Sequence, residues 1–228
     1  MQTNNLFNHL CVAILGYQKD LPTLVGVDGV DASGKTTLAD KLVYRLKESS
    51  RQIIRAPIDG FHNPRAVRYR KGRYSPIGYY QDSFNHQLLI DKLLKPLSSG
   101  DSEYKEAAFN YRIDDEVNMP SKKANKDAIL IVDGIFLFRP ELLDFWDIKI
   151  FLDVSFEVTV LRAVKRSKDR ISLGSEQEII DQYSRRYIPG QKLYFQKANP
   201  QEKADILIDN TDYDNPVIVR NTFRSPRD

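Results

Sequence analysis

The stretch GVDGVDASGKTTLAD, residues 26–40, constrains the fold more than any other part of this 228-residue chain. It contains the spacing G-x-x-x-x-G-K-[ST] at Gly29, Gly34, Lys35 and Thr36. Glycines at these places let the backbone wrap around an anion, and a following helix adds its positive N-terminal end. An apolar run, TLVGV, precedes the loop, and a helical pattern, KTTLADKL, follows it. This context predicts a nucleotide-binding loop between a strand and a helix.

Several residues of this loop have predicted roles in holding a nucleotide. Lys35 reaches the β- and γ-phosphates in such loops, and the Thr36 hydroxyl is a Mg²⁺ ligand. Asp31 is unusual, because a carboxylate repels phosphate, and we expect its side chain to point away, toward a cation elsewhere. The predicted nucleotide-binding residues of the loop are Gly29, Val30, Asp31, Ala32, Ser33, Gly34, Lys35, Thr36 and Thr37.

Short apolar runs that end on aspartate recur along the chain: TLVGVDG, RAPIDGF, AILIVDGI, KIFLDV and ADILIDN. Such runs are typical of strands buried in a parallel sheet, and helical spacing lies between several of them, as at Leu38 to Leu46 and at Val158, Leu161 and Val164. We therefore predict an α/β fold of the P-loop NTPase type, with a doubly wound, mostly parallel sheet and helices on both faces. Ligands bind at the carboxyl ends of such strands, so five aspartates should share one edge. They are Asp28, Asp59, Asp133, Asp153 and Asp209.

Composition limits the other classes of function. The chain has 34 basic and 31 acidic residues and a net charge of +3, which is too balanced to indicate a nucleic-acid partner. A single cysteine fits a reducing compartment, and no apolar run approaches the ~20 residues that span a bilayer. The N-terminus has no basic residues before its apolar centre and does not resemble a secretory signal. We expect a cytoplasmic protein with no membrane partner.

The chain reads as one domain over residues 1–228. We expect an N-terminal helix over residues 1–20 and a loosely ordered tail over residues 221–228. Nothing in the sequence reads as an interface, although a homo-oligomer is possible.

Two of the strand-end aspartates are predicted to work with the phosphate loop. Asp133 resembles a Walker B carboxylate, which holds Mg²⁺. Asp59 would accept a proton from a substrate hydroxyl, as a kinase requires, and His62 is the alternative base or a substrate contact. Asp153, just before a helix, is expected to be a turn or N-cap residue.

The order and spacing of several segments resemble the uridine kinase and phosphoribulokinase family of P-loop kinases. The matching segments, from about residue 23 to 215, are GVDGVDASGKTTLA, IDGFH, QDSFNHQLL, FNYR, IVDGIF, FLDVSFEVTVLRAVKR and KADILIDNTD. The resemblance implies that Asp59, in the family's D-x-F-[YH] element, is the general base. It also implies ATP and Mg²⁺ as cofactors, with GTP left open. Adenine would then pack near ILIDNTDYDNP, where Asn210 and Asp212 can read its edge.

The family also places an arginine-bearing helix over the phosphates as a lid, which corresponds here to residues 162–190. In LRAVKRSKDR, Arg162, Arg166 and Arg170 recur every four residues, so a helix would present them along one stripe. Guanidinium groups there would stabilise the charge of the transferring phosphoryl group, although a solvated helix face is the alternative. The predicted catalytic residues are Asp59, Lys35, Arg162 and Arg166.

The acceptor site departs from the family's pattern. Where uridine kinases carry an aspartate for the ribose hydroxyls, this chain has Tyr79, and Phe109 replaces a tyrosine that reads the pyrimidine. The segment HNPRAVRYRKGRYSPIGYY intersperses five basic residues with four tyrosines. Nucleic-acid binding is one interpretation, but we favour a substrate-covering loop over residues 60–80 that suits an anionic or aromatic acceptor. The predicted substrate-binding residues are His62, Arg65, Tyr79, Tyr80, Phe109 and Arg112.

The sequence thus predicts an ATP- and Mg²⁺-dependent kinase that phosphorylates a hydroxyl of a small molecule, with a nucleoside as the first acceptor. Pantothenate or another hydroxy acid is the second choice among kinases. A P-loop NTPase that acts as a regulatory switch is the alternative from another class.

Overall fold

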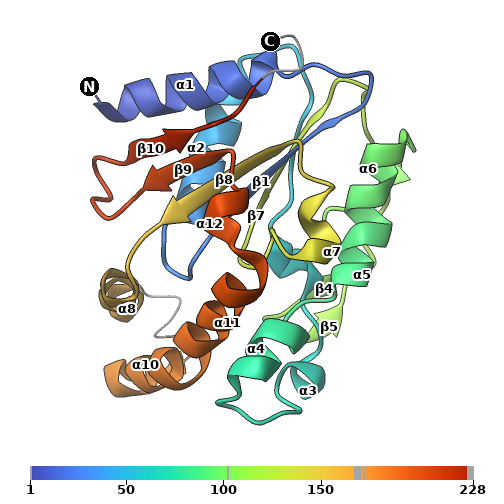
Figure 1. Cartoon of the computed structure of the whole chain (residues 1–228). Coiled ribbons are helices and arrows are strands. Elements are labelled where there is room, and N and C mark those ends of the chain that lie inside the picture. The colour runs from blue at the N-terminus through green and yellow to red at the C-terminus, as the bar shows by residue number, and fades with distance from the viewer. Residues whose placement is uncertain (1, 102, 167–170, 172, 225–228) are drawn as a thin grey trace.

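The computed structural model of the protein describes residues 2–101, 103–166, 171 and 173–224. Its centre is a six-stranded sheet in the order β10-β9-β8-β1-β7-β2, with helices on both faces (Figure 1). Neighbouring strands are parallel, except that β10 runs antiparallel to β9. The predicted doubly wound α/β fold is confirmed. The strands are β1 (Thr23–Gly29), β2 (Ile53–Arg55), β7 (Ile129–Asp133), β8 (Ile148–Asp153), β9 (Ile206–Asp209) and β10 (Val217–Asn221).

The other elements are mostly short. The longer helices are α1 (Gln2–Gly16), α2 (Lys35–Leu46), α4 (Pro76–Asp82), α8 (Phe156–Lys165), α10 (Glu176–Gln182) and α11 (Ile188–Ala198). Short helices and turns are η1 (Ile58–Phe61), α3 (Arg65–Arg68), α5 (His86–Leu89), η2 (Ile90–Leu94), α6 (Lys95–Ser99), α7 (Pro140–Leu143), η3 (Tyr183–Tyr187) and α12 (Pro200–Lys203). Two small ribbons pair β3 (Glu103–Tyr104) with β6 (Lys122–Lys123) and β4 (Phe109–Asn110) with β5 (Asp115–Glu116).

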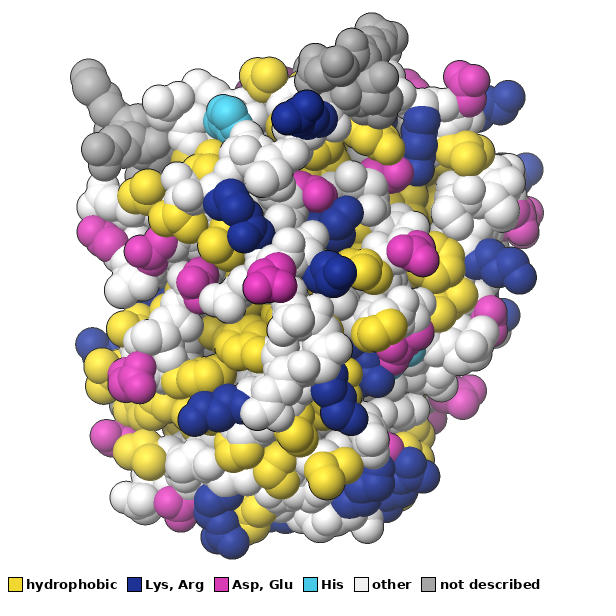
Figure 2. All heavy atoms as spheres, viewed as in Figure 1, with side chains coloured by type: hydrophobic (Ala, Val, Ile, Leu, Met, Phe, Trp, Pro, Cys, Tyr) yellow, Lys and Arg dark blue, Asp and Glu magenta, His cyan; other side chains and the backbone are white. Residues whose placement is uncertain are grey.

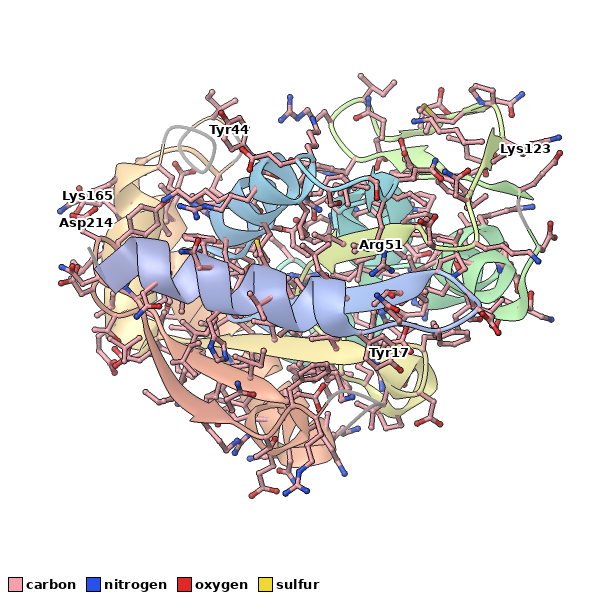
Figure 3. The ribbon with its side chains drawn as sticks, turned by 90° about the horizontal axis from the view of Figure 1, so that it is seen from above. Tyr17, Tyr44, Arg51, Lys123, Lys165 and Asp214 are labelled. Atoms are coloured by element: carbon pink, nitrogen blue, oxygen red, sulfur yellow. The ribbon has the colours of Figure 1, made fainter. Side chains whose placement is uncertain are left out.

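Helices α1 and α2 cover one face of the sheet. Leu6, Leu10 and Ile14 of α1 lie one helical turn apart, so they form one apolar stripe, and they share a buried cluster with Val25 and Val27 of β1. Leu38, Leu42 and Leu46 of α2 join this cluster, as their spacing predicts. Figure 3 shows α1 lying across the sheet, with Tyr17 and Arg51 near its C-terminal end. Arg51 donates to the Tyr17 carbonyl (3.2 Å) and the Thr23 hydroxyl (2.8 Å), which joins the end of α1 to the start of β1.

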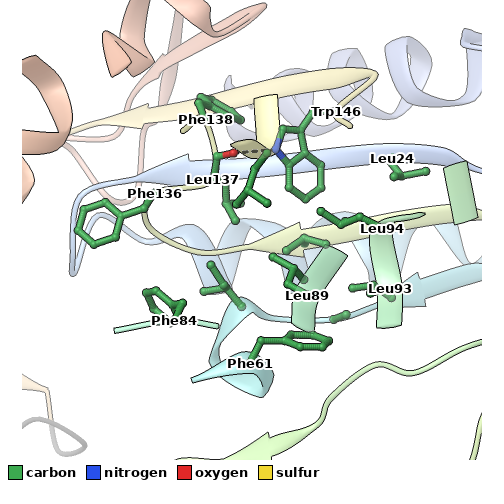
Figure 4. Packing of buried hydrophobic residues seen from close by; sticks show 14 of the residues in the cluster. Leu24, Phe61, Phe84, Leu89, Leu93, Leu94, Phe136, Leu137, Phe138 and Trp146 are labelled. Carbon is green, nitrogen blue, oxygen red and sulfur yellow. Dashed lines mark hydrogen bonds between the residues drawn. The ribbon is translucent and has the colours of Figure 1, made fainter. Parts of the chain in front are cut away.

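The opposite face carries a core rich in aromatic side chains (Figure 4). Leu24 of β1 points to this face because side chains alternate along a strand. The Trp146 indole N–H donates to the Leu137 carbonyl (2.8 Å), which satisfies its one polar atom inside the core. A Cβ added at Gly26 would lie 2.9 Å from the Trp146 ring, so this strand position must be glycine for the indole to pack.

Two expectations about the region of α8 differ from the structure. The buried residues of α8 are Thr159 and Ala163, whereas Leu161 is 63% exposed, because α10 packs on the other side of the helix. The N-cap of α8 is Ser155, and Asp153 instead accepts a hydrogen bond from Gln201 (2.9 Å).

The C-terminal segment is also more ordered than its composition suggests. Asn221 belongs to β10, which the apolar pattern did not predict, and the Phe223 ring lies 6.0 Å from that of Tyr17. Residues 225–228 of the predicted tail lie outside the described residues. Among the helices that are described, none is long and apolar enough to cross a bilayer.

Candidate active site

The loop at residues 29–34 leads from β1 into α2 and is closed by backbone geometry that only glycine allows. Gly29 and Gly34 have φ of +151° and +100°. A Cβ at Gly29 would lie 2.7 Å from the Leu152 carbonyl oxygen, and one at Gly34 would lie 2.6 Å from the Asn210 amide nitrogen. The Lys35 ammonium donates back to the Val30 carbonyl (2.6 Å). The loop therefore has the compact form that its spacing predicts.

Two side chains from outside the loop hold its outer turn. Asn210 donates its side-chain amide to the Ser33 carbonyl (2.6 Å). Arg162 donates to the carbonyls of Asn210 (2.7 Å) and Thr211 (3.0 Å) and reaches that of Ser33 (3.5 Å). The guanidinium of Arg162 is thus engaged by carbonyls between the loop and β9. The prediction of Arg162 as a catalytic lid residue stays a prediction.

The predicted arginine stripe is also interrupted. Helix α8 ends at Lys165, and Arg166 caps it with an extended backbone (ψ 128°), so Arg162 and Arg166 do not lie on one continuous helical face. Arg170 lies outside the described residues. Arg166 nevertheless lies close enough to Lys35 to affect it: burial is the main cause that lowers the pKa of Lys35, and the Arg166 charge acts in the same direction.

Oxygen ligands for a metal ion meet where β1 and β7 lie side by side. The Thr36 hydroxyl donates to Oδ2 of Asp133 (2.6 Å), and Arg55 donates to Oδ1 of the same carboxylate (2.5 Å). Arg55 also pairs with Asp40 (3.0 Å), so one guanidinium links β2, β7 and α2. Sequence reasoning missed Arg55, although its place at the end of a strand beside β7 was a usable signal.

Thr36 and Asp133 fit Mg²⁺, which prefers oxygen ligands and usually takes only one or two carboxylates, with phosphates and water completing its shell. Within the described part of the chain, no three His, Cys, Asp or Glu side chains gather as a metal site. A site with one carboxylate and one hydroxyl therefore suits a metal that arrives with a nucleotide.

Asp59 lies in the short turn η1, four residues beyond the end of β2 rather than at the strand end itself. Its side chain is 48% exposed, and its Oδ1 lies 3.4 Å from Nε2 of His62. The other ring nitrogen of His62 lies 2.9 Å from the Ser83 carbonyl oxygen. Both nitrogens of His62 therefore face protein atoms, which makes the predicted substrate contact by this ring unsupported.

Asp31 has a different partner from the cation that the sequence suggested. The Tyr79 hydroxyl donates to the Asp31 carboxylate, and the Asp31 backbone N–H donates to Gln191 (2.7 Å). Burial is the main cause that raises the pKa of Tyr79 well above its usual range, and the Asp31 charge adds to it. The Tyr79 hydroxyl therefore ties α4 to the phosphate loop.

The sequence profile of the Phosphoribulokinase / Uridine kinase family matches residues 24–213. The chain belongs to this family. It is therefore a P-loop kinase, and its substrate is a small metabolite.

The relatives and solved structures are similar over most of the chain. A protein named uridine kinase from Leuconostoc citreum is 28% identical over 193 residues, covering 82% of this chain and 87% of that one. A uridine kinase from Halalkalibacterium halodurans is 28% identical over 190 residues, covering 82% and 85%. The structure of a possible uridine kinase from Bacillus stearothermophilus superposes with a TM-score of 0.73 at 22% identity, covering 91% of this chain and 99% of that one. At that identity the superposition shows the fold alone.

The predicted acceptor residues of the kinase occupy different environments. Tyr80 and Phe109 are buried, and Tyr80 packs edge-on against Phe136 beneath the Arg139 guanidinium (4.2 Å). Both are core residues in this structure, as is Tyr79, and their role as substrate contacts stays a prediction. Their aromatic rings contribute more to packing than to a binding surface. Arg112, in contrast, is exposed on the turn between β4 and β5.

Residues 60–80 of the kinase are held in place rather than loose. Arg186, 2% exposed in the π-helical turn η3, donates to four carbonyls of this segment. They are those of Arg68 (2.8 Å), Gly72, Arg73 and Ser75 (each 3.2 Å). Sequence reasoning included Arg186 only within the lid, and no spacing marked it as an anchor.

The basic side chains of this segment are largely paired with carboxylates of the kinase itself. Arg70 and Lys71 pair with Asp82 (2.7 and 3.0 Å), and Arg68 pairs with Asp114 (3.0 Å). The backbone N–H of Arg65 also donates to Asp114 (2.8 Å). Figure 2 shows Lys and Arg gathered at the lower right, where α3 and α4 lie in Figure 1. The positive charge of these basic side chains is thus partly neutralised by Asp82 and Asp114.

A shallow hollow that is open to solvent lies beside the phosphate loop. Its cavity volume is about 20 Å³ in this structure. Tyr213 forms part of its wall beneath the Arg162 guanidinium (5.6 Å). The lining residues are Phe7, Gly34, Thr37, Leu38, Lys41, Asn210, Tyr213 and Pro216. The helix α1 therefore contributes to this hollow, which its sequence did not predict.

Asp28, one residue before the loop, is a fully buried carboxylate. It accepts hydrogen bonds from the N–H groups of Gly29 (2.6 Å) and Phe138 (3.1 Å) and from the Tyr194 hydroxyl (2.5 Å). Burial outweighs these bonds and the Lys35 charge and raises the pKa of Asp28 from 3.8 to about 6. The carboxylate joins β1, α11 and the segment after β7.

We expect this pKa to make the stability of the kinase depend on pH. Because the folded-state pKa is raised, Asp28 stabilises the fold fully below pH 3.8, and this contribution is lost as the pH rises through 6. The shift corresponds to about 3 kcal/mol over that range. Asp28→Asn removes the titration. In urea unfolding, the free energy of unfolding of the variant relative to that of the parent should therefore be higher at pH 7 than at pH 4.5. Equal pH dependence in the two proteins would contradict this account, and Asp20→Asn, at an exposed position, is the control.

Proposed function

We propose that the protein is an ATP- and Mg²⁺-dependent kinase that transfers the γ-phosphoryl group to a hydroxyl of a small metabolite. The observation that supports the proposal is the neighbourhood of Asp59, whose carboxylate is half exposed. It follows β2, which runs parallel to β7, and a Cβ at Gly134, next to Asp133, would clash with the Ile58 side chain. A nucleoside is the first acceptor to test, because relatives over most of the chain are named uridine kinases.

The nucleotide would bind with its phosphates in the glycine loop and its base in the hollow at Tyr213. Backbone N–H groups of the loop and the N-terminal end of α2 favour an anion there. Lys35 would leave the Val30 carbonyl for the β- and γ-phosphates. Mg²⁺ bound at Thr36 and Asp133 would neutralise charge on the phosphate oxygens.

In the transfer, Asp59 would take the proton from the acceptor hydroxyl as its oxygen attacks the γ-phosphorus. The new P–O bond forms as the bond between the γ-phosphorus and the β–γ bridging oxygen breaks, and ADP leaves. Lys35 and Arg166 would stabilise the charge on the phosphoryl oxygens in the transition state. Packing of α8, α10 and η3 around Ala32 would help to exclude water from this region.

A hydroxy acid such as pantothenate is the second candidate acceptor. The observation that favours it is the acceptor side of the site, where buried Tyr79 replaces the carboxylate that would hold ribose hydroxyls. Arg65 and Arg112, on the segments that border this side, are cations suited to a substrate carboxylate.

The test is ADP release from ATP and Mg²⁺, with and without uridine, cytidine, other nucleosides, pantothenate and ribulose 5-phosphate. We expect one compound, a nucleoside first, to stimulate the rate at least ~10-fold above the basal hydrolysis, since the acceptor supplies the nucleophile. A slow basal rate that none of them changes would count against these acceptors. It would favour the reading of the chain as a P-loop NTPase switch.

A further inference from the structure

The ring of His62 is fixed by contacts on several sides. It stacks on Phe84 with ring centroids 4.4 Å apart and an interplanar angle of 28°, and Tyr111 approaches it at 5.1 Å. Its Nδ1 lies 2.9 Å from the Ser83 carbonyl oxygen, and a β-bridge joins residues 62 and 84. Its side chain is only 14% exposed. The ring therefore has one defined orientation relative to η1.

This orientation determines which nitrogen of the neutral ring carries the proton. A carbonyl oxygen can only accept, so Nδ1 must be the donor to Ser83. In the neutral ring Nε2 then carries a lone pair, and that lone pair faces Oδ1 of Asp59 at 3.4 Å. A lone pair and a carboxylate oxygen repel each other unless a proton lies between them. The pair is thus arranged to take up one proton, and a small rotation of the half-exposed Asp59 side chain would bring the two atoms into hydrogen-bond range.

We propose that His62 is the positioning residue for Asp59 and the receiver of its proton, which rests on the proposed function of this site. The acceptor's O–H bond breaks as its oxygen bonds to the γ-phosphorus, and the proton moves to Asp59 and then to Nε2 of His62. The resulting imidazolium lies beside the restored carboxylate, so the two charges compensate each other. The proton leaves to solvent before the next turnover. His62 contacts Asp59 and not the acceptor, so its effect is transmitted through the carboxylate.

The groups that surround the ring fit this role. Asp59 is on η1, the Ser83 carbonyl follows α4, and the remaining contacts are the rings of Phe84 and Tyr111. The Ser83 carbonyl also accepts from the Asn63 N–H (3.0 Å), so its position is fixed independently of His62. The carbonyl keeps Nδ1 protonated, and the aromatic rings keep Nε2 directed at Asp59.

The first test reads the tautomer directly. The chain has three histidines, so long-range ¹H–¹⁵N spectra of the free protein can be assigned by the signals lost in His62→Asn. We expect the neutral His62 ring to carry its proton on Nδ1, in contrast to the Nε2–H form that free histidine prefers. An Nε2–H ring would overturn the proposal, because Nε2 could then donate to Asp59 but not receive its proton. The measurement of the tautomer does not require an identified phosphate acceptor.

The second test is a double-mutant cycle in steady-state turnover with the acceptor found by the ADP-release panel. His62→Asn should lower kcat about 10- to 100-fold, as removal of an orienting partner does elsewhere, with the acceptor KM changed less than ~2-fold. In an Asp59→Asn background the same substitution should have no further effect, because His62 acts through the carboxylate. His9→Asn, at an exposed position on α1, is the matched control.

Other outcomes contradict the proposal in recognisable ways. A raised acceptor KM, or a full effect of His62→Asn in the Asp59→Asn background, would make His62 a substrate contact. His62→Phe keeps a ring against Phe84 while removing both nitrogens, so it separates lost packing from lost proton transfer. Equal unfolding midpoints for His62→Phe and the parent, with kcat also unchanged, would overturn the role. If no acceptor supports turnover, the proposed function fails, while the tautomer still decides the arrangement of His62.

Discussion

Asp59→Asn should lower acceptor-dependent kcat by about 10²–10⁴-fold while ATP binding stays within ~2-fold of the parent. The amide keeps the size and polarity of the carboxylate but cannot accept a proton, so the loss falls on the chemical step. Asp59 lies outside the glycine loop, and its side chain is half exposed, so neither phosphate binding nor the core depends on it. The measurement is kcat and KM for both substrates, with ATP affinity from calorimetry.

The matched control for this prediction is Asp91→Asn, at an exposed position on η2. It should leave kcat unchanged. An Asp59→Asn variant as active as the parent would mean that another group takes the proton, and the assignment of the base would be wrong. A variant that instead loses ATP binding would place Asp59 in the nucleotide site.

Lys35→Met should weaken ATP binding and lower kcat by roughly 10²–10³-fold, the cost of removing one preorganised donor from the transferring group. Lys35 is buried with its ammonium on the Val30 carbonyl, one short movement from the phosphate position. Methionine keeps the length and flexibility of the side chain but carries no charge. The measurement is ATP affinity and kcat at saturating acceptor.

The same substitution should not unfold the protein. Burial lowers the pKa of Lys35, which means that the charged form is disfavoured where it lies, so an apolar chain of similar length relieves that cost. We expect an unfolding midpoint no lower than that of the parent. Lys47→Met, at the exposed end of the same helix, is the control and should leave turnover unaffected. Loss of folding in Lys35→Met, or unimpaired ATP binding, would contradict the role of this lysine.

Local patterns predicted those parts of the site that the chain places next to one another. The glycine loop, its lysine and its threonine lie within eight residues, and their conformation follows from glycine backbone freedom and the helix that begins at Lys35. The approach of Asp133 was also predictable, because parallel strands bring their carboxyl ends to one edge. Its place after the next apolar run made Asp59 the candidate base, and the resemblance to a family implied the same role.

Local patterns could not predict which side chains donate hydrogen bonds to backbone carbonyls of distant segments. The sequence placed Arg162 and Arg186 in the lid region, whereas in the structure one bonds between the glycine loop and β9 and the other holds residues 68–75. Tyr79 and Tyr80 read as an aromatic binding surface but pack into the core. Every residue has a backbone carbonyl, so the sequence does not mark which carbonyl will accept a hydrogen bond from a distant side chain.

Periodicity and glycine act over a few residues, so they were enough to predict the phosphate loop, the parallel strands and the edge at which the acids meet. Which side chains face the site depends instead on contacts between distant segments. The ring of His62 is oriented by Ser83 and Phe84, about twenty residues away in the sequence. Arg55 of β2 contacts Asp133 of the neighbouring strand β7. Those contacts depend on how the strands and helices are packed in three dimensions, and the acceptor side of the kinase is built almost entirely from them.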